Sequence, residues 1–398
     1  MSVLPTTTRV YTWQFWLLCF SSTLFFASFN MIIPELPGYL EAMGGGQYKG
    51  LIIALFTVTA GVSRPFSGKL TDQWGRIPVM IFGVVVCVVA SLLYPFTTTV
   101  LAFLGLRLLH GFSTGFKPTA TSAFVGDVVP ANRRGEALGF LGMFGTMGMG
   151  IGPFIGPTIA ATWGTTTMFV ISSGVAGLSV LILLGMKETL KDPMPFHRGM
   201  LRIKRREIIA PEAWPAAIVM ANSVFAFGVL LTLAPDFSMH VGLPPEQKGL
   251  FFSVFTFSSL IIRFLAGRAS DKWGRVLVLR AGMIILLVAL VVLGTATSLP
   301  QFVVGSVLIG FAVGSNSPTL FAWTIDLTPE HIRGRGIATM YIMLEAGIGL
   351  GAVVSGFIFA NQAENLMWAL LSPIPFVLFA LGYLIWGVKP DVPPGKAA

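Results

Sequence analysis

The stretch Gly68-Lys69-Leu70-Thr71-Asp72-Gln73-Trp74-Gly75-Arg76 decides the fold, because the chain contains it twice. The second copy, Gly267-Arg268-Ala269-Ser270-Asp271-Lys272-Trp273-Gly274-Arg275, begins 199 residues later. The same shift relates identical residues on both sides of the loop: Lys49 and Lys248, Arg64 and Arg263, Gly111 and Gly310, Asp127 and Asp326, Gly135 and Gly334. Chance does not maintain one shift over residues 49–135, so the chain consists of two related halves.

The composition indicates that both halves lie in a membrane. Hydrophobic residues make up 54% of the chain and charged residues 11%, whereas soluble domains carry about 25% charged residues. A disordered chain and a disulfide-rich secreted domain are excluded. The two cysteines lie in separate apolar runs, so we expect no metal site.

The apolar runs predict twelve membrane helices, since each span needs about 20 apolar residues. They lie near 12–38, 48–68, 78–97, 100–127, 135–160, 166–186, 214–236, 247–267, 276–296, 299–326, 335–359 and 366–387. The long polar break after Lys187 divides them six plus six. We therefore expect an N-terminal bundle at 1–187, a cytoplasmic loop at 188–213 and a C-terminal bundle at 214–398.

The positions of the basic residues predict the orientation. Most of the 26 Lys and Arg residues fall in the even-numbered loops, the central loop and the two tails. Positive residues accumulate on the cytoplasmic side, so we place both termini in the cytoplasm, at a bacterial inner membrane. The net charge of +9 then reflects orientation rather than nucleic-acid binding. Only Lys49 and Lys248 remain for the outer loops.

These motifs carry a family resemblance. The loop 68–76 resembles the signature of the major facilitator superfamily between helices 2 and 3, and 267–275 is its second copy. Both copies have an aliphatic residue, Ile77 or Val276, where a basic residue often follows. Arg107-x-x-His110-Gly111 resembles the helix 4 motif, with His where Gln is common.

A third motif is similar to that of the drug:proton antiporter families: Gly139-x8-Gly148-x3-Gly152-Pro153-x2-Gly156-Pro157 in helix 5. The resemblance implies an all-α membrane fold of two pseudo-symmetric six-helix bundles, and proton-coupled efflux of a small amphiphilic compound by alternating access. Duplicated halves related by an axis along the membrane normal suit this mechanism. We expect a monomer with a small-molecule substrate, protons and the bilayer as partners. No cofactor is expected, because the proton gradient supplies the energy.

The repeated loop has an expected role in closing the protein. Asp72 follows helix 2, where it can accept hydrogen bonds from a neighbouring helix N-terminus and pair with basic loop residues such as Arg76. Asp271 and Arg275 repeat the arrangement. We expect these contacts to hold the halves together on the cytoplasmic side; the alternative is a purely structural turn.

The helix 5 motif predicts close packing. Gly148, Gly152 and Gly156 give the helix a smooth face, while Pro153 and Pro157 bend it and remove backbone donors. We interpret this helix as a hinge and seal between the halves. Ordinary packing of small residues is the alternative.

Two carboxylates occupy corresponding places near the outer ends of helices 1 and 7. Glu35 follows Pro34, and Asp236 follows Pro235. Each is a candidate for binding a proton or a cationic group of the substrate, because ionisable residues within membrane segments are costly to insert. The alternative is that both are simply solvated among the lipid headgroups.

Helix 4 carries a polar face. At 100° per residue, Arg107, His110, Thr114, Lys117 and Thr121 lie on one side of the helix. Such a stripe is expected to face a water-filled cavity, and the resemblance implies that helices 1, 4, 7 and 10 line that cavity.

Lys117 is a candidate contact for an anionic or zwitterionic substrate, since its repeat equivalent is the neutral Asn316. An alternative role for Arg107 is to control the protonation of Glu35 by pairing with it. His110 either relays protons or makes ordinary hydrogen bonds. Two further amides complete the candidate set for proton coupling or substrate binding: Asn30 and Asn222.

The arginines of the repeat lie inside spans. Arg64 and Arg263 stand eight residues before their loop aspartates, about 12 Å into the membrane. Because the resemblance packs helix 2 on helix 11, we predict an ion pair between Arg64 and Glu345 that acts as a gate or a static contact. Glu345 corresponds to Thr146, so Arg263 is expected to face helix 5 without a carboxylate.

Other functions fit less well. Export or flipping of an anionic amphiphile, such as a lipid or metallophore, and proton-coupled uptake both remain open as alternatives. An enzyme is excluded because the four histidines fall in four separate elements: His110, His197, His240 and His331. The chain also lacks the phosphate-binding loop of ATP-driven proteins.

Overall fold

The computed structural model describes residues 11–130, 133–203, 208–329, 332–360 and 362–388. The regular structure in these ranges is helical. The first half, here the N half, contains α1 (Trp13–Ile32), η1 (Ile33–Glu35), α2 (Leu36–Ala42), η2 (Gly46–Tyr48), α3 (Lys49–Gln73), α4 (Arg76–Leu93), η3 (Tyr94–Phe96), α5 (Val100–Val128), α6 (Arg134–Trp163) and α7 (Thr165–Leu184).

The second half, the C half, contains α8 (Trp214–His240), η8 (Pro245–Gln247), α9 (Leu250–Trp273), α10 (Arg275–Gly294), α11 (Leu299–Leu327), α12 (Arg333–Phe359), η10 (Ala363–Asn365), α13 (Leu366–Leu371), α14 (Ile374–Gly382) and the π-helix η11 (Tyr383–Gly387). Between the halves lie two short turns, η5 (Arg198–Leu201) and η7 (Pro211–Ala213).

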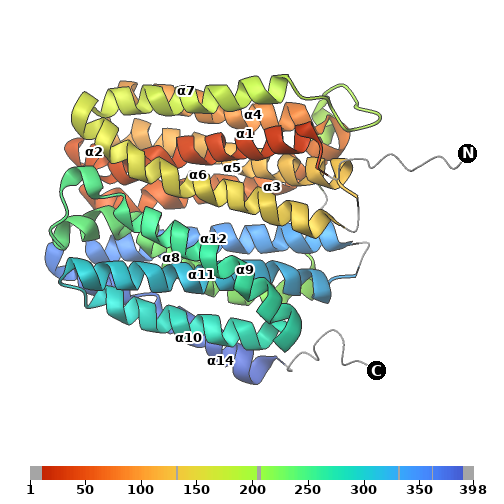
Figure 1. Ribbon diagram of the computed structural model, residues 1–398. Helices are drawn as coiled ribbons and strands as arrows, with labels where there is room; N and C mark the ends of the chain where they lie inside the picture. Colours follow the sequence, from red (N-terminus) through yellow and green to blue (C-terminus); the bar gives the residue numbers. More distant parts are fainter. Residues whose placement is uncertain (1–10, 131–132, 204–207, 330–331, 361, 389–398) are drawn as a thin grey trace, which may run out of the picture.

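The two halves form neighbouring bundles of roughly parallel helices (Figure 1). Within each half α1 packs on α6 and α8 packs on α12. Across the interface α3 packs on α12, and α6 packs on α9. These are the expected contacts of helix 2 with helix 11 and of helix 5 with helix 8, so that prediction is confirmed.

Ten helical stretches within the described ranges are long and apolar enough to cross a membrane. The segments Pro245–Arg263 and Leu265–Trp273 meet at 43° and give an eleventh span when they are taken together. α5 is the expected twelfth. It has the 29-residue length of its repeat equivalent α11 but carries Arg107 and Lys117, which lower its hydropathy.

The repeated loop breaks the chain between two helices at the same place in each half. Gly75 has φ 136° and Gly274 has φ 92°, backbone conformations that residues with a Cβ rarely adopt. The packing between helices repeats as well. A Cβ on Gly111 would collide with the carbonyl oxygen of Phe56, and one on Gly310 would approach the carbonyl oxygen of Phe255.

The bundle has two ends, which we name by residues. The Trp13 end is where α1 begins and α3 ends, and the Glu35 end is where η1 ends and α3 begins. Large apolar side chains remain exposed between the ends, such as Leu101, Phe257 and Phe357. An apolar outer surface of this kind is suited to lipid.

Candidate functional site

Two ion pairs join the halves at the Glu35 end. Nζ of Lys248 lies 2.8 Å from Oε2 of Glu35, and Nζ of Lys49 lies 2.7 Å from Oδ1 of Asp236. Lys49 also lies 3.2 Å from a carboxylate oxygen of Glu41. Glu35 is only 7% exposed, so the alternative of carboxylates solvated among headgroups is wrong for this conformation.

Lys49 and Lys248 were not among the residues expected at this site. The available signal was their position, because Lys49 and Lys248 are repeat equivalents and the only basic residues expected in the outer loops. Two repeated lysines and two nearly repeated carboxylates predict a symmetric pair of contacts. Each lysine reaches the carboxylate of the opposite half, so both pairs must break before this end opens.

Backbone contacts close the same end. A Cβ on Gly249 at the start of α9 would collide with the carbonyl oxygen of Pro153 in α6, and a Cβ on Gly50 in α3 would collide with that of Ala352 in α12. These two contacts are also repeat equivalents. Oγ of Ser253 donates a hydrogen bond of 3.3 Å to the carbonyl of Gly150 nearby. The Glu35 end is therefore closed by directly touching helices.

At mid-depth a buried ion pair crosses the interface between α3 and α12. Nη2 of Arg64 lies 3.0 Å from Oε1 of Glu345, as the sequence predicts. Nη1 of Arg64 donates to Oγ1 of Thr119 at 3.3 Å, and the guanidinium lies 4.3 Å from the ring centre of Tyr341. Arg64 and Glu345 are 6% and 7% exposed. The contact is confirmed; its role as a gate remains a proposal.

Arg263 occupies the equivalent place between α9 and α6. Its Nη1 atom lies 3.9 Å from the position that a Cβ would take on Gly142 of α6. Its Nε is enclosed and has no hydrogen-bond partner among the residues described. No described carboxylate pairs with it, and Thr146 stands where Glu345 stands in the other copy. The expectation that Arg263 faces helix 5 without a carboxylate is confirmed.

The polar face of α5 points into the N half, which corrects the expectation that it faces a water-filled cavity. Arg107 is fully buried. Its Nε donates to the carbonyl of Ile52 at 2.9 Å, and its Nη1 donates to the hydroxyl of Tyr94 at 3.2 Å. Glu35 has Lys248 as its partner instead of Arg107. Helical periodicity predicts which residues share a face but not which neighbour that face meets.

His110 and Lys117 are also fully buried inside the N half. His110 has ordinary hydrogen-bond contacts, 3.2 Å to the hydroxyl of Tyr94 and 3.4 Å to the sulfur of Cys87. Lys117 donates to Oγ of Ser22 in α1 at 2.6 Å. In this conformation neither side chain reaches a space that a substrate can enter. Two threonines of the face, Thr114 and Thr121, are buried with them.

The three candidate amides have partners near their own places in the chain or in a neighbouring helix. Nδ2 of Asn30 donates to the carbonyl of Phe26 at 2.7 Å, and Nδ2 of Asn222 donates to that of Ile218 at 2.8 Å. Each bond stays within one helix turn. Asn316 is buried in α11, with Nδ2 4.0 Å from the sulfur of Met283. No described hydrogen bond joins these amides to one another.

The charges of the repeated loop pair within their own halves. Nε of Arg76 lies 3.0 Å from Asp127, and its Nη1 lies 3.3 Å from Asp72. The second copy has the same contacts, formed by Arg275, Asp326 and Asp271. Asp72 and Asp271 therefore do not hold the halves together here, which corrects that expectation. The physical reason is that the halves already meet at the Glu35 end.

The N-terminus of α4 is capped by a residue that the sequence analysis did not select. Glu188 accepts hydrogen bonds from the backbone N–H groups of Arg76 and Ile77 at 3.1 and 2.9 Å. This was the role expected for Asp72. A carboxylate at a helix N-terminus is stabilised by the unpaired amides there, but the distance in sequence gave no signal for the contact.

The glycines of the α6 motif pack inside the N half. A Cβ on Gly148, Gly152 or Gly156 would collide with carbonyl oxygens of α1. The contacts of these three glycines with α1 agree with the alternative interpretation of ordinary small-residue packing, rather than with a seal between the halves. The carbonyl oxygen of Pro153 contacts Gly249 at the start of α9, across the interface between the halves. α6 runs as one helix through Pro153 and Pro157.

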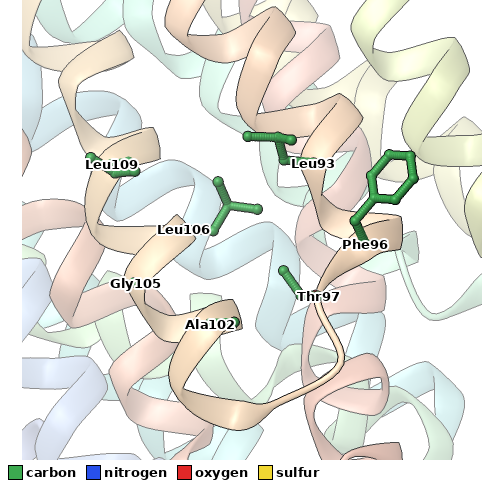
Figure 2. Close-up of a pocket in the computed structure, with 7 residues that line it drawn as sticks. All are labelled: Leu93, Phe96, Thr97, Ala102, Gly105, Leu106 and Leu109. Carbon is green, nitrogen blue, oxygen red and sulfur yellow. The ribbon is translucent and has the colours of Figure 1, made fainter.

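A shallow apolar depression lies apart from these charges, between the end of α4 and the start of α5 (Figure 2). Its lining includes Leu93, Phe96, Leu106 and Leu109, and it has no charged residue. Leu109 is 55% exposed and Phe96 77% exposed on the outer surface. All of its residues belong to the N half, so it is not a site between the halves.

Comparison with known proteins agrees with this architecture. The chain is 24% identical over 394 residues to the multi-drug resistance efflux pump PmrA homolog of Lactococcus lactis, covering 90% of this chain and 93% of the relative. It is 26% identical over 383 residues to the multidrug resistance protein MdtG of Serratia proteamaculans, covering 93% and 92%.

A solved structure, that of a D-xylose-proton symporter, superimposes with a TM-score of 0.78 at 16% identity and covers 95% of this chain and 98% of the other. This likeness shows a shared fold. The sequence profile of the Major Facilitator Superfamily matches residues 18–240 and again 213–398. The chain therefore belongs to the Major Facilitator Superfamily, and it is an integral membrane secondary transporter of a small molecule rather than an enzyme.

Proposed function

We propose that this transporter exports small amphiphilic compounds in exchange for protons, as a monomer in a bacterial cytoplasmic membrane. The efflux pumps to which it is similar support the direction of transport. The distribution of basic residues supports cytoplasmic termini. With that orientation the Trp13 end faces the cytoplasm, and the Glu35 end faces the outside.

The observation that carries the proposal is the buried pair of Arg64 and Glu345, 3.0 Å apart at the interface of the halves. The pair requires an ionised Glu345. A proton on that carboxyl would leave Arg64 buried without a counter-charge, which is strongly unfavourable. A proton on Glu345 therefore strongly disfavours this arrangement of α3 against α12 and shifts the balance between conformations.

The exchange of substrate for protons follows from this effect of protonation on the pair of Arg64 and Glu345. With the Glu35 end closed, Glu345 is ionised and paired, and its proton has left toward the cytoplasm. Substrate entering between the halves from the Trp13 end supplies the free energy that breaks the pairs at the Glu35 end. After that end opens, Glu345 takes up a proton from outside. Reclosing restores the pair with Arg64 and discharges the proton inward.

The pairs of Glu35 with Lys248 and of Asp236 with Lys49 are, in this scheme, the outer latch. They contribute to the closed state only while both carboxylates are ionised. An acidic outer phase therefore favours the open state through these groups, which is the condition needed for releasing substrate outward.

The test uses proteoliposomes and a fluorescent amphiphilic dye that is zwitterionic, with one carboxylate and one cationic group. An imposed pH gradient is expected to accelerate dye transport by the wild type. The variant Glu345→Gln is expected to lose this acceleration while still exchanging labelled for unlabelled dye without a gradient. Glu364→Gln is the matched control, because Glu364 is an exposed carboxylate on the Glu35 side.

Acceleration by the gradient that survives in Glu345→Gln contradicts the assignment of Glu345. A wild type whose dye transport ignores the gradient contradicts proton coupling altogether. Retained exchange distinguishes lost coupling from lost folding, since an unfolded transporter exchanges nothing.

A further inference from the structure

The surroundings of Arg64 and Arg263 differ although the two arginines are repeat equivalents. Arg64 has three partners: the carboxylate of Glu345, the hydroxyl of Thr119 and the ring of Tyr341. The repeat equivalents of Glu345, Thr119 and Tyr341 are Thr146, Pro318 and Gly142, in that order. The charge, the hydroxyl acceptor and the ring are therefore all replaced around Arg263.

The replaced groups leave a charge without a counter-charge. A guanidinium has five donor hydrogens and no acceptor. Among the described residues Nε lacks a hydrogen-bond partner in both Arg64 and Arg263, so the two places differ in their counter-charge: Glu345 pairs with Arg64, and no described carboxylate pairs with Arg263. Gly142 has no side chain at the position where Tyr341 lies over Arg64. Thr146 is 8% exposed, and its hydroxyl already donates to the carbonyl of Gly142 at 2.8 Å. The protein does not provide its own counter-charge at this place.

We propose that Arg263 binds an anionic group of the transported substrate. The site lies at the interface of α6 and α9, where one surface comes from each half. A carboxylate or sulfonate matches the planar fork of the guanidinium. A flat ring attached to it can lie over the guanidinium of Arg263, as the ring of Tyr341 lies over Arg64. The substrate class is then an amphiphile with an acidic group beside an aromatic ring.

This inference rests on the proposed export function and names its substrate class. It also moves the anion site away from Lys117 and Arg107, the basic residues that the sequence suggested. Both of these are enclosed within the N half and hydrogen-bonded there. Arg263, in contrast, is only partly buried and lies against the opposite half.

The test is equilibrium binding to the purified full chain in nanodiscs, without any pH gradient. The probes are radiolabelled naphthoate and its cationic and neutral matches, naphthylmethylamine and naphthylmethanol. We expect the wild type to bind naphthoate more tightly than both matches. Arg263→Ala is expected to weaken naphthoate about tenfold to hundredfold, the worth of a charged hydrogen bond, and to leave the amine unchanged.

A second variant completes the repeat instead of removing the arginine. Thr146→Glu places a carboxylate where Glu345 lies in the other copy, so it is expected to occupy Arg263 and to weaken naphthoate as strongly as Arg263→Ala. Thr146→Gln adds similar bulk without the charge and is expected to weaken it less. Arg268→Ala removes an exposed charge from the same helix and serves as the control.

Equal naphthoate affinity in the wild type and Arg263→Ala overturns the inference. So does a wild type that binds naphthoate no better than naphthylmethanol. Neither result bears on proton coupling, which is measured separately with the zwitterionic dye under a gradient. If that dye is exported normally while naphthoate fails to bind through Arg263, the proposed function stands and the substrate class is wrong.

Discussion

The Glu35 end and the mid-depth interface use the internal repeat in opposite ways. At the Glu35 end both copies are complete, since Lys49 and Lys248 each bind a carboxylate of the other half. At mid-depth only one copy is complete, because Arg64 has Glu345 whereas Arg263 has no described carboxylate. Both halves therefore contribute equivalent contacts that close the Glu35 end. They differ at mid-depth, where a substrate and a proton are expected to bind.

The largest expected effect on stability comes from removing Glu345. Glu345→Ala leaves Arg64 buried without a counter-charge, and we expect it to lower the free energy of unfolding by about 3–5 kcal/mol. Unfolding in mixed micelles measures the change. Arg263→Ala is the matched control, because it removes an arginine that has no such partner. Equal losses in the two variants contradict the asymmetry.

The second prediction concerns the outer latch. Glu35→Gln combined with Asp236→Asn removes two charged hydrogen bonds, each worth about 1.5–3 kcal/mol, so the open-to-closed ratio at the Glu35 end is expected to rise at least about a hundredfold. Spin labels on Gly38→Cys and Glu246→Cys, exposed positions on opposite halves, report the distance. An unchanged distance distribution means that the pairs do not hold this end closed.

A smaller effect is expected from the close backbone contact. Gly249→Ala adds a Cβ that collides with the carbonyl oxygen of Pro153, and overpacking of this kind costs about 1–3 kcal/mol. The same spin labels are expected to show a shift toward the open form. Gly267→Ala in the same helix has nothing near its added Cβ and is expected to behave like the wild type.

The smallest effect is predicted for Lys117. This side chain is buried against Ser22 and is paired with no described carboxylate, so Lys117→Met replaces a costly buried charge by an apolar group of similar length. We expect stability to change by about 1 kcal/mol or less and naphthoate binding to stay as in the wild type. A loss of naphthoate binding restores Lys117 as the anion site.

The sequence alone predicts the architecture well and the site incompletely. The repeat at Gly68 and Gly267 and the spacing of apolar runs are sufficient for two bundles, because each span must be continuous and apolar. The contact of Arg64 with Glu345 is also predictable, since the repeat fixes depth and the family resemblance fixes the neighbouring helix.

What the sequence could not supply is the direction of each side chain around its helix. Arg107 and Lys117 share a face by periodicity, but helices of the same half cover that face. The small residues Gly148 and Gly152 indicate close packing without telling which helix lies against them, and that helix is α1. Contacts between distant segments, such as Glu188 with the start of α4, follow only from the folded arrangement.

The central claim is that substrate and proton move in opposite directions because protonation of Glu345 disfavours its pair with Arg64. The most direct measurement records internal pH in proteoliposomes loaded with a pH-sensitive dye while an outward gradient of the zwitterionic substrate is applied. The account predicts that wild-type vesicles acidify as substrate leaves, and that Glu345→Gln vesicles do not. Alkalinisation of the interior during substrate exit, which indicates symport, or acidification that persists in Glu345→Gln, contradicts it.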